Sequence, residues 1–156
     1  MRKNIKYKVL FLCTSNSCRS QMAEAIINAH YNGQWIAYSA GVDPIGYIHP
    51  IAIQVLNEIG IAHNGRSKSV EEFQNTSLDL VISVCDAAAE ECPLWLGQGR
   101  HIHAGFPDPA KVTGNPEEIL NAFRSVRDEI ILKIPPILKQ YEKYLLENET
   151  SKTHEA

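Results

Sequence analysis

The chain has 156 residues, of which 44% are hydrophobic and 21% charged, which is typical of one globular domain with a single buried core. Its formal net charge of -3 excludes a general attraction to nucleic acid or to an anionic membrane surface. No apolar run is long enough for a membrane span or a signal-peptide core, so we expect a cytoplasmic protein whose four cysteines serve catalysis, redox cycling or metal binding rather than static disulfides.

Apolar strands alternate with helical stretches along the chain. Strands are expected at 7–12, 35–39, 78–84 and 101–104, and helices at 20–29, 50–59 and from residue 116 onward. The alternation predicts an α/β fold, with a central four-stranded parallel sheet between two helical layers (a three-layer α/β/α arrangement).

The last expected helix has Asn115 as its N-cap and an apolar stripe at helical spacing. Pro135-Pro136 interrupts this helix, and since the stripe continues beyond, we expect a kink or a restart rather than a loop. We expect residues 1–146 to form one domain and the polar tail, 147–156, to be disordered.

A loop of small, polar residues separates the first expected strand from the first expected helix. Such a loop points its backbone N–H groups inward and forms a cup for a tetrahedral oxyanion at the helix N-terminus. Cys13 stands at the mouth of the cup, where the positive potential favours its thiolate form, and Arg19 can grip two oxyanion oxygens. The residues expected to bind the oxyanion are Thr14, Ser15, Asn16, Ser17, Cys18, Arg19 and Ser20.

A second pair of cysteines follows the most apolar of the expected strands. Cys85 ends that strand and should lie at the sheet edge that carries the Cys13 loop, and Cys92 follows after six residues. In a regular helix these two cysteines would be about 10.5 Å apart along the axis, whereas a disulfide joins Cα atoms about 4.4–6.8 Å apart. A Cys85–Cys92 disulfide would require the segment to unwind, so we expect a redox-driven switch.

Several other cysteine and acidic residues are expected to have no catalytic role. Cys18 is expected to pack within the loop, and the cysteine spacings match those of structural zinc sites poorly, so we expect no metal. Several acidic residues are expected on solvated faces: Glu71, Glu72, Glu90 and Glu91.

Together these features resemble the thioredoxin-coupled arsenate reductases that are built on the low-molecular-weight tyrosine phosphatase fold. The anion loop by itself identifies only the superfamily, whereas the Cys85/Cys92 pair distinguishes a reductase from a phosphatase. The matching motifs are 13–24, Tyr38-Ser39-Ala40-Gly41, Cys85-x6-Cys92-Pro93, Gly105-Phe106-x-Asp108-Pro109-Ala110 and 123–130.

The resemblance implies reduction of arsenate to arsenite, serving arsenic detoxification. Cys13 would attack arsenic, with Arg19 neutralising charge on the oxygens and Asp108 protonating the leaving oxygen. Cys85 would then attack the Cys13 sulfur, and Cys92 would attack Cys85, which leaves a disulfide that thioredoxin reduces. We expect the protein to be a monomer with no bound cofactor. It takes phosphate or sulfate as mimics of arsenate and retains some phosphatase activity.

The chain departs from some relatives beside the loop. Those relatives bind a monovalent cation through positions that match Asn16, Glu24, Ser39 and an acidic residue, and here that last position is Lys68. The lysine ammonium can take the place of the ion, so we expect no dependence on a monovalent cation.

Two alternatives remain open. One is a low-molecular-weight protein tyrosine phosphatase, although such enzymes usually have tyrosine where this chain has Ala110. The other is a non-catalytic redox or oxyanion sensor, against which the candidate acid Asp108 argues.

Overall fold

The computed structural model of the chain describes residues 6–86, 90, 95 and 97–154. Strands and helices alternate as the sequence predicts, with ends that differ by a few residues. The described elements are β1 (Tyr7–Cys13), α1 (Arg19–His30), β2 (Trp35–Gly41), α2 (Pro50–Asn57), the 3₁₀ helix η1 (Val70–Phe73), β3 (Leu80–Ser83), β4 (Arg100–His103), the 3₁₀ helix η2 (Pro109–Lys111) and α3 (Pro116–His154).

The four strands form one parallel sheet in the order β2-β1-β3-β4, which confirms the predicted α/β fold. The central strands β1 and β3 are buried on both faces, as their nearly continuous apolar sequences require. Because all strands run in one direction, Cys13, Gly41 and Ser83 end their strands at the same edge of the sheet. The loops at this edge hold the predicted functional residues.

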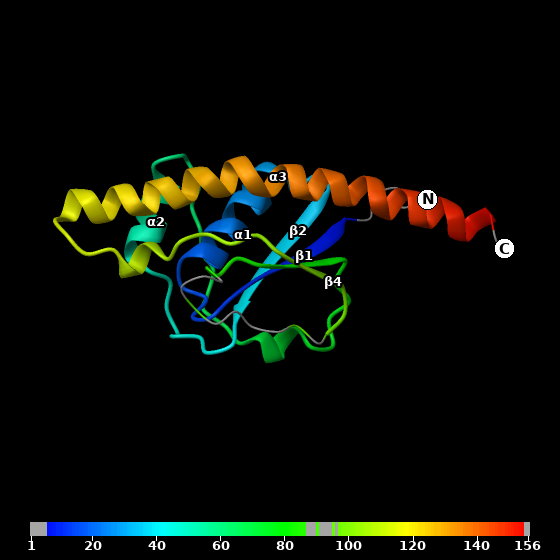
Figure 1. The fold of residues 1–156 in the computed structure, drawn as a ribbon, viewed down its shortest axis with the longest axis horizontal. Helices are drawn as coiled ribbons and strands as arrows, with labels where there is room; N and C mark the ends of the chain where they lie inside the picture. The colour runs from blue at the N-terminus through cyan, green and yellow to red at the C-terminus, as the bar shows by residue number, and fades with distance from the viewer. Residues whose placement is uncertain (1–5, 87–89, 91–94, 96, 155–156) are drawn as a thin grey trace.

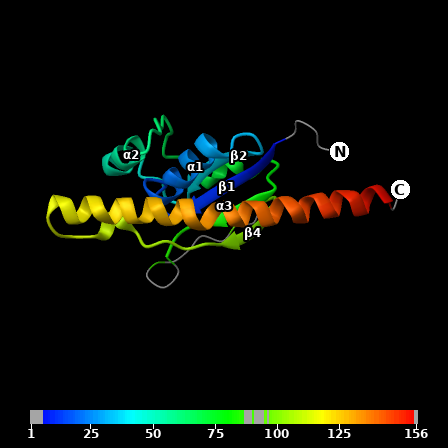
Figure 2. The same cartoon turned by 90° about the horizontal axis from the view of Figure 1, so that it is seen from above.

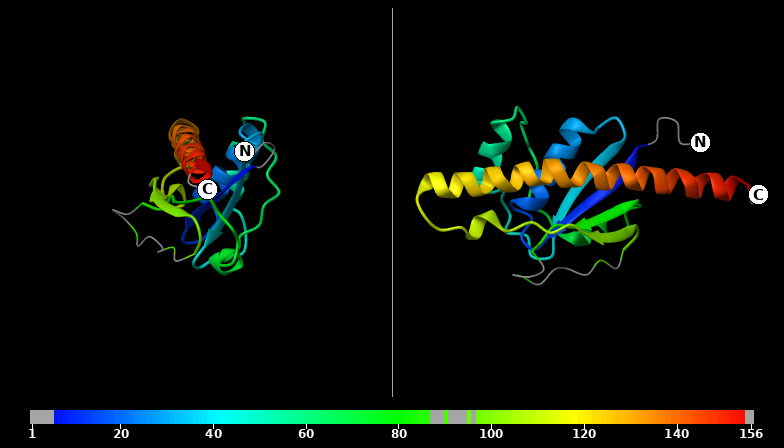
Figure 3. Two further views of the ribbon diagram at one scale, coloured as in Figure 1. Left: turned by 90° about the vertical axis from the view of Figure 1, so that its right-hand side faces the viewer. Right: turned by 45° about the horizontal axis from the view of Figure 1, so that its top comes forward.

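The two faces of the sheet are covered differently. Helices α1, α2 and α3 lie on one face, and η1 lies on the other (Figure 1). An end-on view separates these layers clearly (Figure 3). The larger core, with Phe11, Met22 and Phe123, lies under the helices, and a smaller core with Leu12, Phe73 and Trp95 lies under η1. Among the described residues the second helical layer is therefore thinner than a typical α/β/α layer.

Helix α3 runs along the whole molecule and past the end of the sheet (Figure 2). The Asn115 side chain accepts a hydrogen bond from Glu118 N–H at 2.8 Å, which confirms the predicted N-cap. Pro135 and Pro136 lie inside one continuous helix, where buried residues on both sides of them, such as Ile134 and Leu138, offset the lost hydrogen bonding.

The expectation of a disordered tail from residue 147 is wrong for the described part of the chain, because α3 continues to His154. The sequence beyond Tyr141 contains neither glycine nor proline, the residues that most strongly break a helix, so the helix can continue through the polar tail. None of the described helices is both long enough and apolar enough to cross a membrane.

Candidate active site

The loop between β1 and α1 turns sharply at Asn16, which has a φ of 50°. Asparagine adopts this left-handed conformation more readily than most residues, because its short amide can hydrogen-bond locally. The Asn16 side chain donates to Ser20 Oγ at 2.8 Å and accepts from Gln21 Nε2 and from Lys68 N–H, each at 2.9 Å. These bonds hold the loop from inside.

Gly41, at the end of β2, packs directly against this loop. A Cβ atom at this position would lie 3.0 Å from Asn16 N and still closer to the Thr14 carbonyl oxygen. Gly41 N–H donates to the Lys68 carbonyl at 2.9 Å, which brings the chain around Lys68 behind the loop. The motif that ends in Gly41 thus allows a close approach of two backbones.

Cys13 lies at the base of the loop, and its sulfur has two polar partners. Ser20 Oγ lies 2.8 Å from Cys13 Sγ, and Asn16 N–H donates to the sulfur at 3.1 Å. Both partners can stabilise a thiolate, because each places a donor against the sulfur. The geometry is that of a sulfur nucleophile held by its own loop.

Arg19 opens α1 and is buried, with 3% of its side chain exposed. Its guanidinium donates to the Phe106 carbonyl at 3.1 Å and lies 3.6 Å from the Asp108 carboxylate. It is also paired through both Nη atoms with the carboxylate of Glu90. Burial by itself would lower the pKa of Arg19, but the hydrogen bond to Glu90 and the charge of Asp108 outweigh it and raise that pKa.

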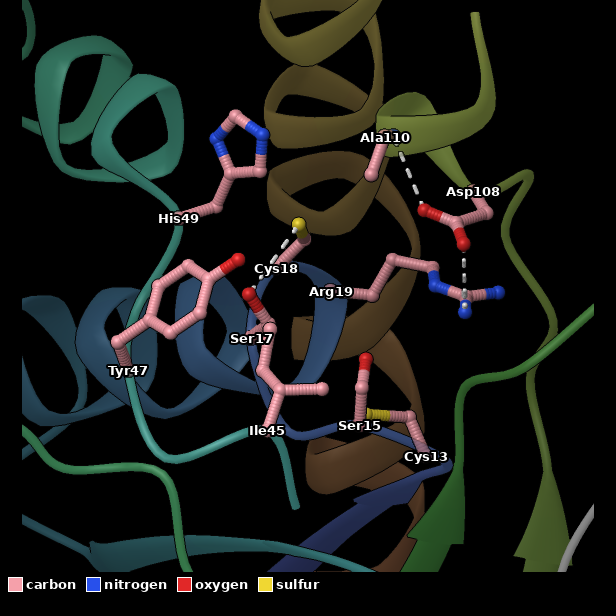
Figure 4. Close-up of a pocket in the computed structure, with 10 residues that line it drawn as sticks. All are labelled: Cys13, Ser15, Ser17, Cys18, Arg19, Ile45, Tyr47, His49, Asp108 and Ala110. Atoms are coloured by element: carbon pink, nitrogen blue, oxygen red, sulfur yellow. Dashed lines mark hydrogen bonds and ion pairs between the residues drawn. The ribbon is translucent and has the colours of Figure 1, made fainter. Parts of the chain in front are cut away.

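Asp108 lies at the start of η2, where its carboxylate accepts a hydrogen bond from Ala110 N–H at 3.0 Å. Figure 4 shows this carboxylate against the Arg19 guanidinium, with Tyr47 and His49 on the opposite side of the pocket. The position gives Asp108 access to an oxyanion in the loop. A carboxyl group there can donate a proton to a leaving oxygen.

These side chains line a cavity of about 290 Å³ at the carboxyl edge of the sheet. Its lining is Cys13, Ser15, Ser17, Cys18, Arg19, Ile45, Tyr47, His49, Asp108 and Ala110. The structure thus brings together the predicted nucleophile, the predicted cation and the predicted acid.

Cys18 belongs to the loop but differs from Cys13 chemically. Burial and the negative charge of Asp108 raise the pKa of Cys18 to about 12, so it remains a protonated thiol at neutral pH. Its sulfur lies 4.0 Å from Ser17 Oγ. The whole residue is only 5% exposed. This environment agrees with a packing role.

Cys85 lies just beyond β3 and is fully buried. It takes part in a disulfide bond, whereas Cys13 and Cys18 are free thiols. Leu12 is opposite Ser83 in the register of β1 and β3, so Cys13, which ends β1, and Cys85, two residues after β3, lie at the carboxyl ends of neighbouring strands. The predicted redox partner Cys92 lies outside the described residues, as do most of the residues between Cys85 and Cys92.

A buried charged cluster lies behind the anion loop. Lys68 Nζ lies 3.5 Å from the Glu24 carboxylate and donates to Ser39 Oγ at 3.3 Å, which are the positions that the resemblance assigns to a cation. His63 lies 3.4 Å from Glu24 on the other side and 2.7 Å from Gln21 Oε1. Within the described residues, no group of His, Cys, Asp and Glu side chains is arranged to hold a metal ion.

Two residues of the site differ from the sequence-based expectation. The sequence predicts a solvated position for Glu90, but its side chain is only 12% exposed and is paired with Arg19. His49, which belongs to none of the predicted motifs, lines the cavity, and its Nδ1 accepts a hydrogen bond from Ile51 N–H at 3.1 Å to cap α2. The position of His49 before Pro50 is a local sign of the cap, whereas no local pattern signals the Glu90 contact.

Residues 8–145 match the family model described as low molecular weight phosphotyrosine protein phosphatase. An arsenate reductase of Halalkalibacterium halodurans is 41% identical over 131 residues, which cover 83% of this chain and 91% of that protein. An arsenate reductase of Bacillus subtilis is 40% identical over 123 residues, or 78% of this chain and 88% of the relative.

Solved structures show the same likeness. An arsenate reductase in its phosphate-binding state aligns with a TM-score of 0.68 and 29% identity, over 86% of this chain and 98% of that one. A low molecular weight protein tyrosine phosphatase from T. tengcongensis aligns with a TM-score of 0.66 and 27% identity, over 86% and 99% of the two chains. The fold is thus shared by proteins of both names.

Proposed function

Since the chain belongs to the low molecular weight phosphotyrosine protein phosphatase family, we propose that it is a member that reduces arsenate to arsenite. One observation favours arsenate reduction over phosphatase activity. A bonded Cys85 follows the strand next to the one that ends in the free thiol Cys13. Hydrolysis of a phosphate ester needs one thiol, whereas the two-electron reduction of arsenate needs a second. The curated relatives at about 40% identity are named arsenate reductases, which supports the same choice.

The first step is attack of the Cys13 thiolate on arsenic. A sulfur–arsenic bond forms, and one hydroxyl group of arsenate leaves as water after it receives a proton from Asp108, which lies 3.6 Å from Arg19 in the lining of the cavity. Arg19 and the N–H groups of the loop neutralise charge on the remaining oxygens. Ser20 and Asn16 hold the sulfur in the attacking position.

The second step transfers the electrons. The Cys85 thiolate attacks the Cys13 sulfur, a Cys13–Cys85 disulfide forms, and the electron pair of the broken sulfur–arsenic bond remains on arsenic, which leaves as arsenite. Cys92 then attacks Cys85, so that Cys13 is released as a thiol and a Cys85–Cys92 disulfide remains. A free Cys13 together with a disulfide-bonded Cys85 is the state expected at the end of this sequence.

The cycle closes when a dithiol donor reduces that disulfide, and we propose thioredoxin as the donor. We propose further that the protein acts in the cytoplasm as a monomer without a bound cofactor. Because the Cys13 step needs neither Cys85 nor Cys92, we also propose residual phosphatase activity on small aryl phosphates.

The test is arsenate-dependent oxidation of NADPH, coupled through thioredoxin and its reductase, for the wild type and for Cys13→Ser, Cys85→Ser and Cys92→Ser. Each substitution should abolish turnover. Hydrolysis of p-nitrophenyl phosphate should be lost only in Cys13→Ser, which provides an internal control for folding of the other two. Full turnover by Cys92→Ser would disprove the three-cysteine sequence, and an inactive wild type would disprove the function.

A further inference from the structure

The guanidinium that the proposed function assigns to the substrate already holds a carboxylate from this chain. Glu90 meets Arg19 with both of its oxygens, one of them at 3.2 Å from Arg19 Nη2. Asp108 lies 3.6 Å from the same nitrogen. One positive group therefore faces two carboxylates, and an oxyanion in the loop would be a third negative group at this site.

Glu90 reaches Arg19 from the segment that follows the bonded cysteine. The backbone N–H of Asp86 donates to Glu90 Oε1 at 2.6 Å, and Glu90 N–H donates back to the Asp86 carbonyl at 2.9 Å. Asp86 is the direct neighbour of Cys85, which is in a disulfide bond. The position of the Glu90 carboxylate is thus linked through two hydrogen bonds to the backbone beside the disulfide.

The charge state of Glu90 fits this arrangement. Burial by itself would raise the pKa of Glu90, but the hydrogen bonds from Arg19 and from Asp86 N–H outweigh it and hold that pKa below its usual value. Glu90 is therefore an anion at neutral pH, paired with the same guanidinium that the proposed function assigns to a bound oxyanion.

We propose that Glu90 is an internal competitor of the substrate oxyanion, which occupies Arg19 while Cys85 is oxidised and is released when the disulfide opens. The role in a catalytic cycle depends on the proposed function, whereas the competition for Arg19 depends only on the contacts above. The consequence is ordered binding: the oxidised protein binds arsenate weakly until its disulfide has been reduced. A new substrate then enters only when the second thiol is available to complete the reduction.

The test measures binding of inorganic phosphate, which mimics the shape and charge of arsenate but accepts no electrons from thiols. Phosphate is titrated calorimetrically into the wild type, Glu90→Gln and Glu90→Ala, each in its oxidised and its dithiothreitol-reduced form, with the Cys85 disulfide verified by mass spectrometry. Glu72→Gln is the matched control, because it removes the same charge from an exposed pair with Arg66.

In the oxidised state both Glu90 variants should bind phosphate at least about tenfold more tightly than the wild type, since a competing charged hydrogen bond is removed. In the reduced state the wild type and the variants should agree within about twofold, and Glu72→Gln should follow the wild type in both states. Unchanged or weaker binding by the oxidised Glu90 variants would overturn the competition. An equal gain in both states would overturn its dependence on the disulfide.

Because the titration uses neither arsenate nor thioredoxin, its result is independent of the turnover assay. A wild type that fails to reduce arsenate but shows the redox-dependent gain would disprove the proposed function alone. An active enzyme without the gain would disprove the competition alone.

Discussion

The Ser20 hydroxyl lies 2.8 Å from the Cys13 sulfur, although the two residues belong to different elements, α1 and β1. Ser20 is fully buried and also accepts a hydrogen bond from the Asn16 side chain, which leaves its own proton available to be donated to a Cys13 thiolate. A charged hydrogen bond contributes about 1.5–3 kcal/mol. The contact is therefore expected to stabilise the attacking thiolate.

Replacing Ser20 tests this contact. Ser20→Ala should lower kcat/KM for arsenate by about 10- to 100-fold, as the loss of one hydrogen bond to a charged sulfur predicts. Ser125→Ala, at an exposed position of α3, is the control and should retain the wild-type value. An unchanged kcat/KM for Ser20→Ala would show that the hydroxyl does not act on the thiolate.

The role of Asp108 as an acid is tested by Asp108→Asn, which keeps the size of the side chain but cannot donate a proton in the same way. We expect kcat for arsenate to fall by about 10²–10⁴-fold, the usual contribution of a general acid. Asp128→Asn, at an exposed site of α3 beside Arg127, should leave kcat unchanged. If phosphate binding were lost while kcat for bound arsenate stayed normal, Asp108 would act in binding and not in proton transfer.

Lys68 leads to a prediction about salts. Its ammonium lies 3.5 Å from Glu24 and 3.3 Å from Ser39 Oγ, so a positive charge is already present behind the loop. Steady-state kinetics in potassium chloride and in sodium chloride of equal ionic strength should therefore give the same kcat and KM. A severalfold increase in affinity for arsenate with potassium would contradict the prediction.

The ion pair between Lys68 and Glu24 also contributes to the stability of the fold. Glu24 is buried, which raises the pKa of Glu24 in spite of the Lys68 charge, so removal of the lysine leaves an unfavourable carboxylate in the core. Lys68→Met should lower the free energy of unfolding by about 3–5 kcal/mol in urea titrations. The double variant Glu24→Gln/Lys68→Met should recover most of this loss. Lys133→Met, which removes an exposed partner of Glu129, should cost at most about 1 kcal/mol.

His63 makes stability depend on pH. Burial and the charge of Lys68 lower the pKa of His63 below its ordinary 6.5, so the unfolded chain takes up the proton first as the pH falls. This contribution to stability is present above pH 6.5 and is lost as the pH falls below it. Urea unfolding between pH 7.5 and pH 5.5 should therefore show a shallower decline for His63→Gln than for the wild type.

Other ionisable groups also contribute to the dependence of the free energy of unfolding on pH, so His63→Gln should remove only part of the decline. The pKa values of His49 and His101 are also lowered, chiefly by burial, and both act in the same direction as His63. The raised pKa of Glu24 acts in the opposite direction. His30→Gln, at an exposed site in the last turn of α1, is the control. An identical slope for His63→Gln and the wild type would disprove the contribution of His63.

The amino-acid sequence by itself determines the parts of this protein that depend on local pattern. The apolar runs around Val9 and Val81 predict buried parallel strands, and the small residues between Cys13 and Ser20 predict the anion loop. Parallel strands must end at one edge, so the common position of Cys13, Cys85 and Asp108 follows from the order of elements along the chain. Composition does not predict the structure of the tail beyond residue 146, because its polar residues suggest disorder but continue α3 to His154.

Only the tertiary structure decides which charged groups meet. Glu90 and Arg19 are 71 residues apart, and Lys68 N–H meets the Asn16 side chain across 52 residues. A charged residue in a polar stretch has the same local pattern whether it faces water or a buried partner. Its partner is fixed by the packing of loops at the end of the sheet, where desolvation makes a well-paired buried charge tolerable and an unpaired one costly.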